Sequence, residues 1–278
     1  MQIDGFDADV FVRATLAEDL GAGGDITSAA CISADARLSA LLVARGEVSV
    51  AGLPLALAFF RALDPECHCE ALVADGTRVT AGTALARVEG LARALLAAER
   101  SALNTLQHLT GVATLTRSYV AAIAGTGCTL LDTRKTTPGL RLLEKYAVRM
   151  GGGTNHRLRL DEAPMVKDNH IAAAGGVTAA VAACKRAGLR DITVEVDRID
   201  QIEPAIAAGA DRLLLDNMPV PVLREAVALV AGRVPTEASG GVRLENVRAI
   251  AETGVTFVSV GRLTQSAPAA DIGMDFAG

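Results

Sequence analysis

A repeated pattern in the second half of the 278-residue chain most constrains its fold. Short apolar runs begin at residues 192, 212, 234 and 256, which are 20 to 22 residues apart, and an Ala-rich stretch of helical character follows each. The runs read ITVEV, RLLLDN, VPTEASGG and TFVSVG, and LLDTRKT from 130 and PMVKDNH from 164 extend the series backward. Strands that alternate with helices are typical of parallel βαβ units. The regular spacing predicts a βα barrel.

Each predicted strand of this series ends in a polar residue or a glycine. In a βα barrel the carboxyl ends of the strands build the active site. One such residue could be a helix N-cap, as Asp216 could, but six in register predict a shared site at one end of the barrel. The six residues are Asp132, Lys167, Glu195, Asp216, Ser239 and Gly261.

The first hundred residues show a different pattern. We expect a helix from Asp7 to Leu20, short strands around 37–45, 67–73 and 84–89, and a long helix from about Leu91 to Ile123. This mixture predicts a separate N-terminal α/β domain, residues 1–110, followed by a βα-barrel catalytic domain, residues 111–278. The C-terminal tail, about 267–278, is a candidate addition to the first domain.

Composition limits the class of protein. Half of the residues are hydrophobic, so the chain can bury a large core in one or two domains. The first ten residues are acidic, unlike a signal peptide, and the most apolar stretch, 48–60, is short and contains Pro54. Five cysteines form no even framework, which is typical of reduced thiols. We therefore expect a cytoplasmic protein without a membrane segment, in which Cys67-His68-Cys69 belongs to a strand rather than to a zinc site.

Positive charge gathers in one segment of an acidic chain. Residues 132–167 hold eight Lys/Arg and four Asp/Glu, whereas the whole chain carries −5. This contrast indicates a pocket for a small polyanion rather than a nucleic-acid surface. A clamp of Arg134, Lys135, His156 and Arg157 suits carboxylates, and nearby glycines permit close backbone approach, although a cation run is often only a solvated face.

Other cations and glycines allow narrower interpretations. Arg141, Lys145 and Arg149 recur at i, i+4 and i+8, which predicts one charged helix face. The SGG at 239–241 follows a strand and precedes VRLENVRAIAE, so we expect a phosphate at a helix N-terminus there. Alone it could be a simple strand-to-helix turn, but VGR at 260–262 closes the next strand, and barrels commonly bind phosphate after their last two strands.

Carboxylates and a lysine supply further chemistry. The run KDNH at 167–170 is compatible with acid/base work, and Glu195 and Asp216 suit ribose hydroxyls or a hydrated Mg²⁺. The chain has neither a GxSxG, nor a Walker A sequence, nor a GxGxxG after a strand. These absences argue against an acyl enzyme, an NTPase and a dinucleotide oxidoreductase.

Several motifs together resemble one family. In chain order they are EDLGAGGDIT, ALNTLQHLTGVATLT, DTRKTTPGLRLLEKYAVRMGGGTNHR, VKDNHI, VEV, LLDNM, SGG and SVGRLTQSAP. This set resembles quinolinate phosphoribosyltransferase, also called nicotinate-nucleotide pyrophosphorylase (carboxylating), over essentially the whole chain. DTRKTTPGLR together with GGGTNHR is the most specific part.

The resemblance implies an α/β fold, an N-terminal α/β sandwich domain plus an incomplete, open βα barrel. It implies a pentosyltransferase of de novo NAD biosynthesis that joins quinolinate to phosphoribosyl pyrophosphate. The products would be nicotinate mononucleotide, CO₂ and pyrophosphate, with Mg²⁺ as cofactor. It also implies a homodimer, or a higher oligomer, in which Arg100 reaches the partner subunit's site.

The resemblance also assigns site residues. Lys135, Lys167, Glu195 and Asp216 would be catalytic, with Mg²⁺ near Glu195 and Asp216, directly or through water. Substrates would contact a larger set, namely Arg100, Arg134, Lys135, Thr136, His156, Arg157, Lys167, Glu195, Asp216, Ser239, Gly240, Gly241, Val260, Gly261 and Arg262. Attack of the pyridine nitrogen through an oxocarbenium-like state needs no enzymic nucleophile. Lys135 or Lys167 is our hypothesis for the group that protonates the decarboxylated ring.

Two alternatives remain open at the level of sequence. One is a ModD-like, pyrophosphorylase-related protein of molybdenum transport, although TTPGLR and KDNH favour the quinolinate enzyme. The other is a non-catalytic sensor of an anionic metabolite, which would be expected to have lost Lys167, Glu195 or Asp216. Gln265 and Met150 depart from the residues we expect in relatives, His and Cys, and we expect neither to be central to the chemistry.

Overall fold

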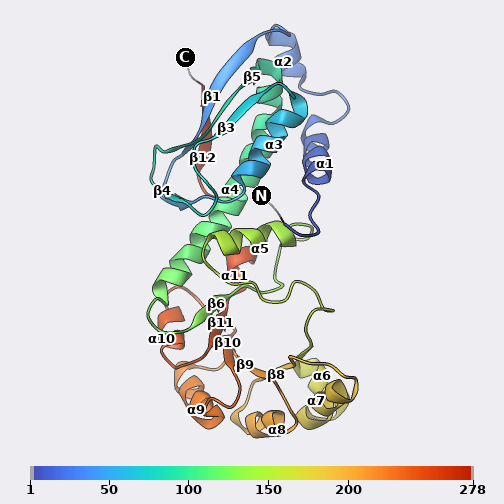
Figure 1. The fold of residues 1–278 in the computed structure, drawn as a ribbon, viewed down its shortest axis with the longest axis vertical. Coiled ribbons are helices and arrows are strands. Elements are labelled where there is room, and N and C mark those ends of the chain that lie inside the picture. The colour runs from blue at the N-terminus through green and yellow to red at the C-terminus, as the bar shows by residue number, and fades with distance from the viewer. Residues whose placement is uncertain (1–2, 277–278) are drawn as a thin grey trace. The chain divides into compact units, whose positions relative to one another are not determined.

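The computed structural model describes residues 3–276, which form two compact units (Figure 1). The first unit consists of three stretches, which are the chain up to Arg117, Leu142–Gly152 and the chain from Ser266 onward. The second unit consists of Ser118–Arg141 and Gly153–Gln265. The sequence-based boundary at residues 110 and 111 lies inside the long helix α4 (Ala92–Ala122).

The first unit is built on a four-stranded antiparallel sheet in the order β12-β1-β5-β3. The strands are β1 (Arg37–Ala44), β3 (His68–Ala71), β5 (Ala84–Leu91) and β12 (Ile272–Phe276), and a small ribbon pairs β2 (Val48–Ser49) with β4 (Arg78–Val79). Buried and more exposed residues alternate over most of β5, as expected for a strand with one face on a core. The C-terminal segment therefore completes the N-terminal sheet.

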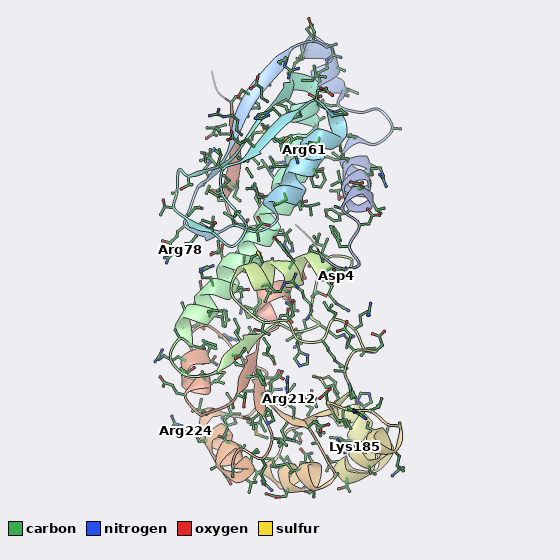
Figure 2. The ribbon with its side chains drawn as sticks, viewed as in Figure 1. Asp4, Arg61, Arg78, Lys185, Arg212 and Arg224 are labelled. Carbon is green, nitrogen blue, oxygen red and sulfur yellow. The ribbon has the colours of Figure 1, made fainter. Side chains whose placement is uncertain are left out.

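Helices supply the second layer of this unit. They are α1 (Ala8–Leu20), α2 (Ile26–Cys31), α3 (Leu53–Leu63), the part of α4 up to Arg117 and most of α5 (Arg141–Met150). Helix α3 packs on β3 and β5 and buries Phe59 and Phe60 completely. Asp7 and Asp25 cap α1 and α2, and the Asp75 carboxylate accepts the amides of Gly52 and Leu53 at 2.9 and 3.0 Å at the start of α3. Side chains fill the interior of each unit (Figure 2).

The second unit is built on a six-stranded parallel sheet in the order β6-β11-β10-β9-β8-β7. Its strands are β6 (Thr129–Leu131), β7 (Met165–Val166), β8 (Thr193–Val196), β9 (Arg212–Asp216), β10 (Thr236–Ser239) and β11 (Phe257–Ser259). A single bridge joins Leu131 to Thr154. Within residues 3–276 no pairing joins β6 to β7, so the barrel is open. The predicted α/β sandwich with an incomplete βα barrel is confirmed.

Short helices follow the strands of the second unit. They are α6 (Asp168–Ala174), α7 (Val177–Arg186), the 3-10 turn η1 (Ile199–Gln201), α8 (Ile202–Ala207), α9 (Val220–Val230), α10 (Val247–Ala251) and α11 (Arg262–Gln265). Figure 1 shows α7, α8 and α9 along one side of the sheet. Val194, Leu213, Leu215 and Val258 are completely buried, which accounts for the apolar runs in the sequence. No helix in the described part of the chain is long and apolar enough to span a bilayer.

The predicted charged face of one helix is wrong. Helix α5 exposes Arg149, but Lys145 is only 1% exposed and Glu144 is completely buried. Glu144 Oε1 lies 2.9 Å from His108 Nε2. Arg141 is half-buried and donates to Thr136 Oγ1 at 3.0 Å and to the carbonyl of Leu158 at 3.1 Å. Charged side chains can be buried when they are paired, so their spacing along a helix does not by itself identify a solvated face.

Candidate active site

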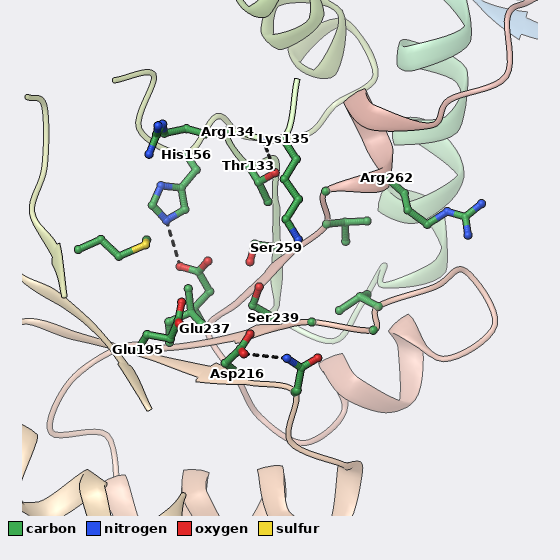
Figure 3. A pocket seen from close by; sticks show the side chains of 18 of the residues that line it. Thr133, Arg134, Lys135, His156, Glu195, Asp216, Glu237, Ser239, Ser259 and Arg262 are labelled. Atoms are coloured by element: carbon green, nitrogen blue, oxygen red, sulfur yellow. Dashed lines mark hydrogen bonds and ion pairs between the residues drawn. The ribbon is translucent and has the colours of Figure 1, made fainter. Parts of the chain in front are cut away.

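A cavity of about 690 Å³ lies at the carboxyl ends of the parallel strands in the second unit (Figure 3). Most of the predicted site residues line it: Arg134, Lys135, His156, Arg157, Lys167, Glu195, Asp216, Ser239, Gly240, Gly241, Val260, Gly261 and Arg262. Two predicted residues do not. Arg100 is an exposed residue of α4 in the first unit, and the Thr136 hydroxyl accepts the Arg141 guanidinium instead.

The cationic wall of the cavity comes from the segment after β6 and from the segment after Gly153. The Thr133 hydroxyl accepts the amide of Lys135 at 3.0 Å, and the Thr264 hydroxyl donates to the Lys135 carbonyl at 2.6 Å. Arg134 Nε is buried, and no residue of the described chain hydrogen-bonds it. A buried donor without a partner costs free energy unless a ligand satisfies it. Arg134 is therefore set to bind an acceptor in the cavity.

Arg157 stands close enough to Arg134 for their charges to interact. Burial, with a further contribution from the charge of Arg134, lowers the pKa of Arg157 below its ordinary value. Arg157 Nη1 donates to the carbonyl of Ala163 at 2.6 Å, which fixes the guanidinium. Two partly buried guanidinium groups held near each other favour a ligand with more than one negative charge.

His156 is positioned by its own segment of chain. The buried carboxylate of Asp132 accepts the amide of His156 at 2.8 Å and the side chain of Asn155 at 2.6 Å. The amide of Arg157 donates to His156 Nδ1 at 2.7 Å, so the neutral imidazole carries its proton on Nε2. Asp132 was predicted with the polar strand ends, but it does not line the cavity and instead holds the residues that do.

Acidic residues form the opposite side of the cavity. Glu195 is paired with Lys167, and Asp216 Oδ2 accepts the side chain of Asn217 at 2.7 Å. No group of three or more His, Cys, Asp or Glu in residues 3–276 is arranged to hold a metal ion. Mg²⁺ needs only one or two protein carboxylates when water and substrate phosphates supply its other ligands. Glu195 and Asp216, each with one oxygen engaged by a neighbour, fit such a shared site.

Two glycine segments, Gly240-Gly241 and Gly261, line the cavity. Gly240 has φ +86° and Gly241 has φ +61°, and no acceptor in the described chain pairs with either amide. The predicted helix N-terminus at SGG is wrong, because α10 begins only at Val247. The donors belong to the loop itself, in the manner of a backbone nest for anions. At Gly261 a Cβ would lie 2.8 Å from Lys135 Cδ, a contact that movement of the flexible lysine side chain would relieve.

Replacing Gly240 with alanine should disturb this loop. The new Cβ would collide with the side chain of Asn217 and lie 3.0 Å from its amide nitrogen, at a φ that L-residues rarely adopt. We expect the protein to lose about 1–2 kcal/mol of stability from the left-handed conformation, and the KM for a phosphate-bearing substrate to rise about tenfold through the shifted loop. Chemical denaturation and steady-state kinetics measure both.

Gly125→Ala is the matched control, because Gly125 has φ +79° and open space around its Cβ. This variant should lose similar stability and keep its KM. An unchanged KM in Gly240→Ala would contradict the assignment of the loop.

Sequence reasoning missed several residues that line the cavity. They are Thr133, Met165, Leu214, Asn217, Glu237, Val242, Arg243, Ser259 and Gln265. Glu237 is the most informative, since it is a completely buried carboxylate two positions before the predicted Ser239. Side chains two residues apart on a strand point to the same face, so this period could have identified it. Gln265 lines the cavity, although we expected no central role for it.

Comparisons with known proteins agree over the whole chain. The family model of the quinolinate phosphoribosyl transferase N-terminal domain matches residues 25–110, and that of the C-terminal domain matches residues 112–275. A probable carboxylating nicotinate-nucleotide pyrophosphorylase of Synechocystis is 43% identical over 271 residues, which cover 96% of this chain and 91% of the relative. A protein of the same name from Bacillus subtilis is 43% identical and covers 93% of this chain and 89% of its own.

The fold is similar to solved structures as well. The nicotinate-nucleotide pyrophosphorylase of Francisella tularensis superposes with a TM-score of 0.93 at 39% identity, covering 100% of this chain and 99% of that one. The two domain models together match nearly the whole chain, and the relatives and the solved structure cover it at 39% to 43% identity. These findings together identify the family. The chain belongs to the quinolinate phosphoribosyltransferase family.

Proposed function

We propose that the protein transfers the phosphoribosyl group of phosphoribosyl pyrophosphate to the nitrogen of quinolinate and releases CO₂ and pyrophosphate. The product is nicotinate mononucleotide, an intermediate of de novo NAD biosynthesis. One observation carries this proposal beyond family membership. The cavity is lined by six Lys/Arg and three carboxylates, in a chain whose net charge is −5. Quinolinate carries two carboxylates, and phosphoribosyl pyrophosphate carries a phosphate and a pyrophosphate. A cavity that binds both substrates therefore needs several cations.

The two sides of the cavity bind different groups of the substrates. Arg134 and Arg157, with His156 and Lys167, face the two carboxylates of quinolinate. The amides of Gly240, Gly241 and Gly261 receive the phosphate. In Figure 3 the side chain of Arg262 extends away from Glu195 and Asp216, so a phosphate that Arg262 binds would lie apart from these carboxylates. Charge that develops as the glycosidic bond breaks is met by donors and cations already in place, and such preorganised stabilisation contributes most of the rate enhancement in many enzymes.

Mg²⁺ belongs to the proposal through the carboxylates. Glu195 and Asp216 would hold it together with the ribose hydroxyls and the pyrophosphate of the substrate. When bound, the ion would neutralise the departing pyrophosphate. Lys167 is paired with Glu195, so it also keeps that carboxylate from repelling an anionic substrate before the ion arrives.

Two further proposals concern the setting of the enzyme. A homodimer, or a larger oligomer, would bring the exposed Arg100 of one subunit to the site of its partner, and sedimentation measurements would detect it. A cytoplasmic location is supported by five free cysteines in the described chain, including Cys67 and Cys69, whose Sγ atoms lie 3.4 Å apart without a bond.

A direct assay tests the function. Purified protein is incubated with quinolinate, phosphoribosyl pyrophosphate and Mg²⁺, and nicotinate mononucleotide, CO₂ and pyrophosphate are quantified. A parallel sample contains nicotinate in place of quinolinate. We expect product only with quinolinate, because a single carboxylate leaves part of the cationic wall unpaired.

Other outcomes have definite meanings. Product from nicotinate alone would overturn the choice of substrate. No product from either acid, in folded protein that binds phosphoribosyl pyrophosphate, would favour a ModD-like or sensor protein. Retention of Lys167, Glu195 and Asp216 around one cavity argues against the sensor.

A further inference from the structure

A charged pair, a completely buried glutamate and a half-buried arginine, lies inside the open barrel below the cavity. Parallel pairing puts Glu195, Leu214, Glu237 and Phe257 at one level of the sheet. Arg212 precedes Leu214 by two residues in β9 and so points to the same side. Barrel interiors are usually filled with branched apolar residues. Here an arginine and a glutamate occupy that place.

The contacts of Glu237 join this layer to the cavity. Glu237 Oε2 lies 3.3 Å from Arg212 Nη1 and 3.4 Å from His156 Nε2, and the glutamate side chain is 0% exposed. The Arg212 guanidinium stands 4.3 Å from the centre of the Phe257 ring. Figure 3 shows Glu237 beneath His156, joined to it by a dashed line. A chain of contacts thus runs from Phe257 through Arg212 and Glu237 to the imidazole.

Such an arrangement is not what stability alone would select. Burying the Glu237 carboxylate removes its charge from water, and apolar residues of similar size often stabilise a core equally well or better than a buried charge with its partner. Losing one partner is costly, because the other charge stays buried and unpaired. Stability does not explain the pair, so we look for its function at the His156 imidazole, which Glu237 contacts.

We propose that Arg212 and Glu237 are positioning residues that fix the His156 imidazole for quinolinate binding, with Arg212 keeping Glu237 ionised as the acceptor of the Nε2 proton. This inference rests on the proposed function. It assigns to His156 a ring held from both nitrogens, since Nδ1 accepts the Arg157 amide and Nε2 faces Glu237. The imidazole ring therefore has a fixed orientation in the cavity before the ligand binds.

The ionisation of Glu237 supports the geometry. Burial alone would raise the pKa of this carboxyl, but the nearby His156 imidazole, then the Ser259 hydroxyl and then the charge of Arg212, in decreasing order of effect, outweigh burial and bring the pKa below its ordinary value. Without Arg212, one of the charges that lower the pKa is lost, so the pKa of Glu237 should rise. Arg212 from β9 and His156 after Gly153 contact Glu237. The other charged groups that line the same cavity are Asp216 from β9, Glu195 from β8, Lys167 after β7, Arg134 and Lys135 after β6, Arg157 after Gly153, Arg243 after β10 and Arg262 after β11.

A double-mutant cycle tests the pair. We expect Arg212→Met to lower kcat/KM for quinolinate about tenfold at pH 6 and to recover by pH 9, because a raised pKa protonates Glu237 only on the acid side. Glu237→Gln should lose about tenfold at every pH, since it lacks the ionised acceptor. Adding Arg212→Met to Glu237→Gln should change nothing further. Arg212→Lys should retain most of the activity, and the KM for phosphoribosyl pyrophosphate should stay constant throughout.

The experiment needs a control variant on the surface and a measurement that does not depend on substrate. Arg233 and Glu203 form an exposed ion pair in the same unit, so Arg233→Met should leave kinetics unchanged. The chain has four histidines, so ¹⁵N imidazole signals can be assigned with a His156→Gln reference. We expect the His156 signals to move in Arg212→Met and Glu237→Gln without any substrate, while those of His68, His108 and His170 stay.

Three results would overturn the inference: additive losses in the cycle, equal changes in KM for both substrates, or unmoved His156 signals. The spectra distinguish this failure from failure of the proposed function, because they need no turnover. An inactive wild type whose His156 signals respond to Arg212→Met would refute the function and leave the positioning pair in place.

Discussion

Asp216→Asn should lower kcat by about 10²–10³, the size expected when a group that stabilises transition-state charge is removed. Asp216 ends β9 on the acidic side of the cavity, where ribose and Mg²⁺ would be held. Asparagine has the same shape and can still accept the Asn217 side chain, so the loop should survive. The lost charge should raise the Mg²⁺ concentration needed for half-maximal rate. A magnesium titration of the initial rate measures this shift.

The control for this variant is Asp200→Asn. Asp200 pairs with Arg198 on the surface of the same unit, and its side chain is 71% exposed. This change should leave both kcat and the magnesium titration as in the wild type. If Asp216→Asn behaved in the same way, the carboxylate would have no part in holding the metal or the ribose.

The strand ends show how far sequence reasoning reaches. A run such as RLLLD places its last residue at the carboxyl end of a parallel strand, so the sequence alone is enough to assign Asp216 and Ser239 to one cavity. Glu237 is harder to assign. The period of two places it on the same face as Ser239, but its partners Arg212 and His156 come from other segments and are recognised only in the structure.

A short motif also does not determine where a helix begins. SGG followed by VRLENVRAIAE suggests a helix that begins at once, yet residues 242–246 form a loop held by the Asn246 side chain, which accepts the Arg243 amide at 2.8 Å and donates to the Gly241 carbonyl at 3.1 Å. Helical spacing misled similarly in α5, where Lys145 is buried. In both cases tertiary contacts, which no short window contains, decided the outcome.

Lys135→Met should separate the two halves of the reaction. The side chain of Lys135 extends into the cavity beside Gly261, its main chain is anchored by Thr133 and Thr264, and no carboxylate in the described chain pairs with its ammonium group. Lys167 is instead paired with Glu195. A proton needed by the decarboxylated ring comes more readily from an unpaired ammonium, so Lys135 is the stronger candidate for this step.

In a single turnover of Lys135→Met we expect pyrophosphate to appear while CO₂ lags, with the decarboxylation rate down by about 10²–10⁴, the usual contribution of a general acid. Lys167→Met is the comparison variant, and it should weaken quinolinate binding and release both products together. Pyrophosphate and CO₂ falling in parallel in Lys135→Met would place that lysine in phosphoribosyl transfer. An unaffected rate of CO₂ release would remove it from proton delivery, and a lag in Lys167→Met would transfer the role to Lys167. The order of product release therefore identifies which ammonium group protonates the ring, a distinction that neither lysine's place in the cavity can make alone.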